Sequence, residues 1–130
     1  MQRENINPWQ WQDAFGFSQA VEVRGGQRVL YCAGQAAVSA EGQPLPLFDL
    51  PAQINQCFDN LAAVLGAAGM NLGNVVRLVY YTTDVNALLG QWELVKARLA
   101  AAGIQPASSV VGVTQLAFDL QIEIEATAAD

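Results

Sequence analysis

The sequence predicts an α+β fold with a single sheet and two helices on one face of that sheet. Short segments rich in β-branched and aromatic residues alternate with two segments whose apolar residues recur every three or four positions. The expected order along residues 1–130, treated as one domain, is β-β-α-β-α-β-β. A helix joins two of these strands, which predicts that the two strands are parallel neighbours.

The first two strands are expected at residues 20–24 and 28–33, with residues 34–38 extending the second strand. Gly25 and Gly26 stand between them, and a glycine pair suits the tight turn of a hairpin. The sequence therefore predicts that these two strands pair with each other.

The first helix follows a loop that contains three prolines. Asp49 is a suitable N-cap, and Pro51 fits the first turn because its missing N–H is not needed there. Gly69 is expected to end the helix. The apolar stripe of this helix consists of Ile54, Phe58, Leu61, Leu65 and Ala68.

Residues 75–83 are expected to form a central strand. A second helix begins at Asp84 or Asn86 and ends at Gly103. Pro106 then favours an extended entry into a strand at residues 109–114.

The last strand, residues 121–128, carries Glu123 and Glu125 on the face opposite to Ile122 and Ile124. Two carboxylates on one face belong either to a solvated side of the sheet or to a functional site. The pattern by itself leaves both interpretations open.

Composition excludes several classes of function. The net charge is −6 and the basic residues are scattered, which argues against nucleic-acid binding because phosphate backbones require clustered cations. The chain has no histidine, so a transition-metal site and a Ser-His or Cys-His nucleophile are not expected. Cys32 and Cys57 lie in apolar segments and are expected to be reduced core residues.

We expect a cytoplasmic protein without membrane contact, since no leader-like segment or long apolar run is present. Apolar residues make up 52% of the chain and charged residues 14%, against a typical charged share of about 25%. Part of the apolar surface is therefore expected to lie in an interface between subunits.

Several motifs resemble those of the RidA family, also called YjgF or L-PSP endoribonuclease-like. They are Gly34-Gln35, the Thr83-to-Asn86 segment, Pro106-Ala107 and the closing run from Ile122 to Ala126. The resemblance implies a chorismate-mutase-like fold and a homotrimer whose sheets form a central barrel. It implies small-molecule clefts between subunits and hydrolysis of enamines or imines, such as 2-aminoacrylate, to keto compounds and ammonia without a cofactor.

Active members hold the substrate carboxylate with an arginine and use a glutamate to hold water and move protons. Glu123 matches that glutamate, whereas Ser108 stands at the arginine position. Gly34 matches a substrate-binding backbone position. The other pocket positions of the family are also substituted, and here carry Phe17, Ala33, Trp92 and Val110.

Three hypotheses follow from this resemblance. The first is an enamine or imine hydrolase that uses Glu123 on a substrate without a carboxylate or on one with a larger apolar part. The second is a non-catalytic trimer that binds a small apolar or aromatic metabolite. The third, a ribonuclease, fits least well with an acidic chain that lacks histidine. Purely structural roles are the alternative at two of these positions. Trp92 could serve only to pack the core, and Ser108 could serve only to hydrogen-bond local backbone groups.

Overall fold

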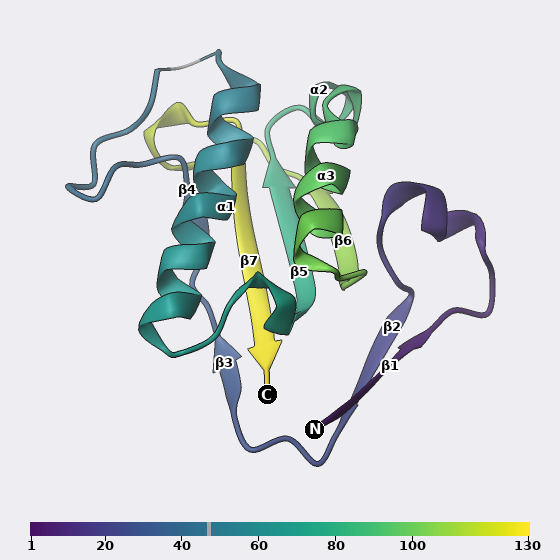
Figure 1. Ribbon diagram of the computed structural model, residues 1–130. Coiled ribbons are helices and arrows are strands. Elements are labelled where there is room, and N and C mark those ends of the chain that lie inside the picture. Colours follow the sequence, from purple (N-terminus) through teal and green to yellow (C-terminus); the bar gives the residue numbers. More distant parts are fainter. Residues whose placement is uncertain (47) are drawn as a thin grey trace.

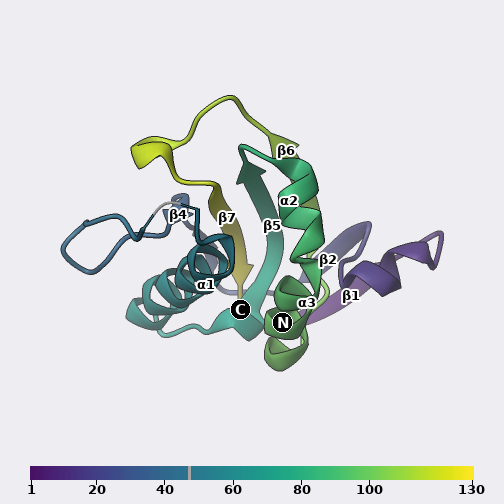
Figure 2. The same ribbon diagram turned by 90° about the horizontal axis from the view of Figure 1, so that it is seen from above.

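The computed structural model describes residues 1–46 and 48–130, and its centre is a sheet covered on one face by helices (Figures 1 and 2). The strands are β1 (Gln2–Ile6), β2 (Ala20–Arg24), β3 (Val29–Tyr31), β4 (Gln35–Ala36), β5 (Val75–Thr82), β6 (Ala107–Gly112) and β7 (Ile122–Ala129). The α-helices are α1 (Leu50–Ala67), α2 (Val85–Gly90) and α3 (Trp92–Ala102). Three short 3₁₀ turns complete the chain: η1 (Trp11–Phe15), η2 (Leu72–Asn74) and η3 (Ala117–Asp119).

The main sheet has the strand order β3-β7-β5-β6, and β4 also pairs with β7. β5 and β6 are parallel, as the helical connection between them predicts, and β7 is antiparallel to β5. Strand β6 is therefore an edge strand of this sheet.

Side chains alternate between the two faces of β7. Ile122, Ile124 and Ala126 are at most 2% exposed and pack under the helices, whereas Glu123 is partly exposed and Glu125 is exposed on the open face. Each isoleucine buried in this way stabilises the fold by about 1.5–3 kcal/mol. The alternation predicted for the last strand is thus confirmed.

Helix α1 begins and ends as predicted. The Asp49 side chain accepts a hydrogen bond from the Ala52 N–H, and Pro51 lies in the first turn. The chain leaves the helix through Gly69, whose φ of 75° is in the left-handed region.

The second helical segment differs from the prediction because it is two helices rather than one. Asp84 caps α2 by accepting from the Ala87 N–H, and the helix ends at Gly90. α3 then begins at Trp92 and ends before Gly103, which has a φ of 71°. Glycine is a poor helix former, which accounts for the interruption.

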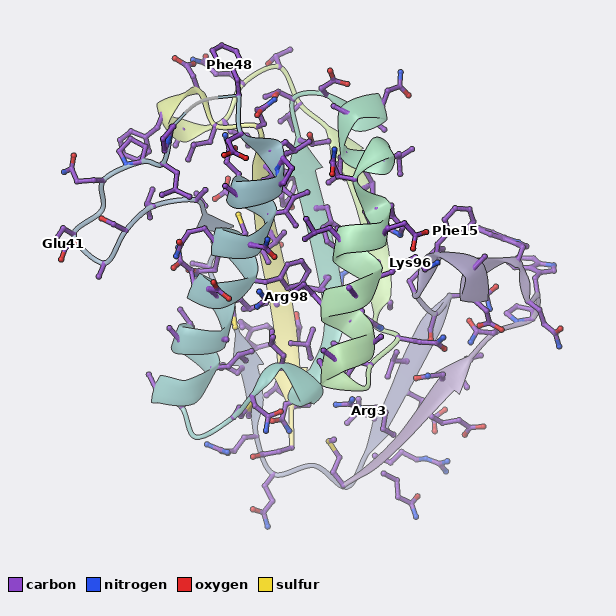
Figure 3. The ribbon with its side chains drawn as sticks, turned by 45° about the horizontal axis from the view of Figure 1, so that its top comes forward. Arg3, Phe15, Glu41, Phe48, Lys96 and Arg98 are labelled. Atoms are coloured by element: carbon purple, nitrogen blue, oxygen red, sulfur yellow. The ribbon has the colours of Figure 1, made fainter. Side chains whose placement is uncertain are left out.

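The predicted hairpin at Gly25 and Gly26 is wrong. β2 pairs with β1 in a separate two-stranded sheet, while β3 joins β7 at the edge of the main sheet. The backbone N–H groups of Gln27 and Arg28 donate to the Asp130 carbonyl, so the connection follows the end of β7 instead of folding back. Strand β1, which the sequence did not predict, is tied to the body where the Arg3 guanidinium donates to the Gly73 carbonyl (Figure 3).

None of the helices in residues 1–46 and 48–130 combines the length and the hydropathy needed to cross a bilayer.

Candidate functional site

A pocket of about 220 Å³ lies between the N-terminal arm (residues 9–17, which include η1), the α2–α3 helices and edge strand β6. Its lining is almost entirely apolar and contains no charged residue. It consists of Trp11, Phe15, Phe17, Leu89, Trp92, Ser108, Ser109 and Val110. Four of the positions that the sequence assigned to the pocket therefore meet here.

Trp92 joins this pocket to the core. Its indole N–H donates to the Phe15 carbonyl at 2.8 Å, which holds η1 against α3. The other side of the indole meets the buried Tyr80 ring edge-on, with ring centroids 5.1 Å apart. Trp92 thus serves the core and the pocket lining at once.

The outer wall of the pocket is aromatic. Trp11 packs edge-on against Phe15 and against Phe17, with centroid distances of 6.3 Å and 5.8 Å. At the end of η1, a Cβ added to Gly16 would be 3.5 Å from Leu99 Cδ1 and 3.6 Å from Lys96 Cγ, both on α3. The close approach of η1 to α3 sets the position of this wall.

Ser108 is half-buried on the helix-facing side of β6, opposite Leu78 of β5. Its hydroxyl donates to the Pro106 carbonyl at 3.0 Å. The predicted local role of this serine is thus present in the structure, and Ser108 also belongs to the pocket lining.

Glu123 lies on the other face of the sheet. It is paired with Tyr81 of β5 and with Ala36 of β4, whereas Ser108 is paired with Leu78. Since successive residues of a strand point to opposite faces, Glu123 and Ser108 of one chain point away from each other.

Gly34 is in contact with the Glu123 carboxylate. A Cβ added to Gly34 would lie 2.3 Å from Glu123 Oε1 and 2.8 Å from Glu123 Cδ, so glycine is the residue that fits here. The predicted pair Gly34 and Glu123 therefore lies together. Ala33 precedes this pair and is exposed.

The seven predicted site residues thus divide into two groups, which we call the pocket half and the acid half. The pocket half consists of Phe17, Trp92, Ser108 and Val110. The acid half consists of Ala33, Gly34 and Glu123. Four further residues line the pocket and are not among the seven predicted site residues: Trp11, Phe15, Leu89 and Ser109.

The cations in the described ranges do not replace the arginine. Arg24, Arg28, Lys96 and Arg98 each form an ion pair with a carboxylate. Arg77 is exposed on β5, opposite Thr127 of β7, and so lies on the open face away from the pocket. Within the ranges on either side of residue 47, no three His, Cys, Asp or Glu side chains gather to hold a metal ion.

The charge of Glu123 influences a buried thiol, that of Cys57. Burial, and secondarily this carboxylate, raise the pKa of the Cys57 thiol to about 12. Cys57 and Cys32 are both buried and free, as the sequence predicted. Neither thiol lines the pocket.

This chain is similar to proteins of a known family. The model of the endoribonuclease L-PSP family matches residues 11–130. A RutC family protein of Aquifex aeolicus is 32% identical over 86% of this chain and 86% of its own length. The 2-iminobutanoate/2-iminopropanoate deaminase of Escherichia coli K12 is 32% identical over 77% of this chain and 78% of its own length.

Solved structures agree with these matches. The Rid family protein YyfB from Yersinia pestis, a protein of unknown function, is 39% identical, and the match covers 100% of both chains with a TM-score of 0.88. The YjgF gene product of Escherichia coli is 30% identical over 87% of each chain with a TM-score of 0.72. The predicted fold class is confirmed by these neighbours.

Proposed function

Because this chain belongs to the endoribonuclease L-PSP family, the group of the RidA and YjgF proteins, we propose that it is an enamine or imine hydrolase acting on substrates without a carboxylate. The observation that carries the proposal is Glu123, which is retained and held against Gly34 while Ser108 stands at the arginine position. The deaminase of Escherichia coli, 32% identical to this chain, supports the reaction class.

The chemistry needs few groups. An imine carbon is electrophilic, so the protein mainly positions this carbon and a water molecule. The Glu123 carboxylate takes a proton from the water as the water oxygen bonds to the imine carbon, and passes this proton to the nitrogen, which gives a carbinolamine. The carboxylate then takes the proton of the new hydroxyl group and passes it to the nitrogen as the carbon–nitrogen bond breaks, which leaves a carbonyl compound and ammonia.

We further propose that a complete site forms between two copies of this chain in a homotrimer. The pocket half and the acid half lie on opposite faces of one sheet, so a single chain cannot close both around one ligand. The open face of the sheet also exposes apolar side chains, including Tyr31 at 82% and Val29 at 56%. A neighbouring copy covering this face would bring its own acid half to the pocket half of the first.

Substrate choice follows from Ser108. A carboxylate in the pocket would meet apolar rings and no cation, and burying an unpaired charge is costly. We expect ammonia release from a panel of carboxylate-free imines and turnover close to background with 2-aminoacrylate. Rapid hydrolysis of 2-aminoacrylate would reject the proposed selectivity, and no ammonia from any imine would reject the reaction.

Complementation between two damaged chains tests the shared site. Glu123→Gln removes the proton shuttle, and Val110→Trp fills the pocket, so each variant alone should be inactive. After equal mixing and random reassembly, about a quarter of all sites, one in each mixed trimer, should combine an intact pocket half with an intact acid half. Activity that returns only after the chains are mixed supports the proposal. Mixed trimers without activity, or a monomer by light scattering, would contradict it.

A non-catalytic binding protein is the second candidate. The apolar lining of the pocket and the engagement of Ser108 with its own backbone favour it. Calorimetric binding of an apolar ligand together with no ammonia release from the imine panel would establish this candidate over the first.

A further inference from the structure

The polar group at position 108 of the pocket has the opposite hydrogen-bonding character to the arginine it replaces. An arginine is purely a donor, and therefore pairs with carboxylates. A serine hydroxyl has one proton, and Ser108 gives this proton to the Pro106 carbonyl at 3.0 Å. The Ser108 oxygen keeps only its lone pairs for a ligand and so offers an acceptor to the pocket.

The rest of the lining defines the shape of the ligand. Trp11, Phe15, Phe17 and Trp92 surround a volume of about 220 Å³, below the roughly 300–1,000 Å³ of pockets that hold drug-sized molecules. Trp11 is 58% exposed and Phe15 is 44% exposed. A flat ring covering them would remove apolar area from water, worth about 25 cal/mol per Å². It would also form edge-to-face contacts of the kind that these rings already make.

We infer that the pocket half selects a planar aromatic ligand that carries an N–H or O–H donor and no carboxylate, with Ser108 as the acceptor that determines specificity. This inference rests on the proposed function only in taking the pocket half as the ligand-binding part of the site. It assigns the donor to the ligand and the acceptor to the protein.

Two isosteric probes separate shape from hydrogen bonding. Indole and benzofuran have nearly the same ring system, but indole carries an N–H where benzofuran carries an oxygen. Binding to the full-length wild-type protein is measured by titration calorimetry. We expect indole to bind about five- to tenfold more tightly, the effect of one hydrogen bond. Indole-3-carboxylate should bind more weakly than either because its charge finds no partner.

Ser108→Ala tests whether the preference for indole over benzofuran depends on the Ser108 hydroxyl. The variant should bind benzofuran as the wild type does, which shows that its pocket is intact, and its preference for indole should disappear. Equal binding of indole and benzofuran by the wild type would overturn the inference. So would a preference that persists in Ser108→Ala, tightest binding of indole-3-carboxylate, or no binding of any probe at millimolar concentration.

Turnover is measured separately on the imine panel. A preference for indole that depends on Ser108, found in a protein without ammonia release, would support this inference while rejecting the proposed reaction. Ammonia release without the preference would do the reverse.

Discussion

The pocket half and the acid half of the candidate site resemble the RidA pattern to different degrees. In the acid half, by this resemblance, Gly34 and Glu123 match while Ala33 does not, and Gly34 and Glu123 lie so close that a Cβ at position 34 would be 2.3 Å from Glu123 Oε1. In the pocket half, Ser108 and Trp92 depart from the pattern and the lining is apolar. Under the proposed function, recognition and proton transfer can change separately, because within one chain their residues lie on opposite faces of the sheet.

Glu123→Gln is expected to have the largest effect. Removing the proton shuttle should lower imine hydrolysis by about 100-fold or more, while binding of an aromatic probe by the pocket half stays within about twofold. Ammonia release and calorimetry measure the two properties. Glu125→Gln is the matched control, since Glu125 is on the same face two residues away and exposed. Equal losses in the two variants would show that general charge, rather than Glu123, matters.

Ser108→Arg tests the pocket half. A guanidinium at this position can grip a carboxylate with two hydrogen bonds, so turnover of 2-aminoacrylate should rise about 10-fold or more. Ser108→Lys, which adds the charge without the planar fork, should give a smaller gain. No gain from the arginine would mean that the aromatic wall leaves the carboxylate no room, and would confine the substrates to uncharged imines.

Gly34→Ala disturbs the acid half without removing it. The added methyl group must displace the Glu123 carboxylate, and we expect hydrolysis to fall by about 10-fold through misplacement of the base. Gly66→Ala in α1 is the control, because a Cβ there meets nothing within 4 Å. It should leave turnover unchanged and raise the free energy of unfolding by up to about 1 kcal/mol. Unchanged turnover in Gly34→Ala would show that the contact does not position Glu123.

The smallest expected effect is a dependence of stability on alkaline pH. The pKa of the Cys57 thiol is raised from 9.0 to about 12, so the neutral thiol favours the folded state. Its contribution is complete below pH 9 and is lost as the pH rises towards 12. The free energy of urea unfolding should therefore decline over this window, and decline less steeply in Cys57→Ala.

The same titration links the core to the acid half. Because the charge of Glu123 contributes to the raised pKa of Cys57, Glu123→Gln should lower this pKa. Ultraviolet absorbance of the thiolate follows the titration directly. Identical thiol titrations in the wild type and Glu123→Gln would place the carboxylate too far from Cys57 to act on it.

Local pattern was sufficient for much of the fold. The stripe and the caps of α1 and the alternation of β7 depend on neighbours within a few residues, and these predictions are confirmed. The pairing of β2 with β1 could not be read in this way. Strand β1 is also tied to the rest of the molecule by the hydrogen bond from Arg3 to Gly73, which are 70 residues apart in the chain. A glycine pair permits a hairpin without requiring one.

The site shows the same division. The resemblance to the RidA family identified the candidate positions. The separation of Ser108 from Glu123 follows instead from the register of their strands against β5, where Leu78 pairs with Ser108 and Tyr81 pairs with Glu123. The position of Phe15 in the pocket wall depends on the hydrogen bond between its carbonyl and the Trp92 indole, and these two residues are 77 positions apart in the chain. A single sequence carries no signal for that contact.

The hydrogen bond between Trp92 and the Phe15 carbonyl makes this indole an intrinsic optical reporter. Trp92 is 8% exposed, whereas Trp9 and Trp11 are 57% and 58% exposed, so its emission will lie to the blue of theirs. Its fluorescence depends on whether the N-terminal arm is docked, because release of η1 would bring water to the indole N–H. Changes at the pocket can thus be followed in real time without a label.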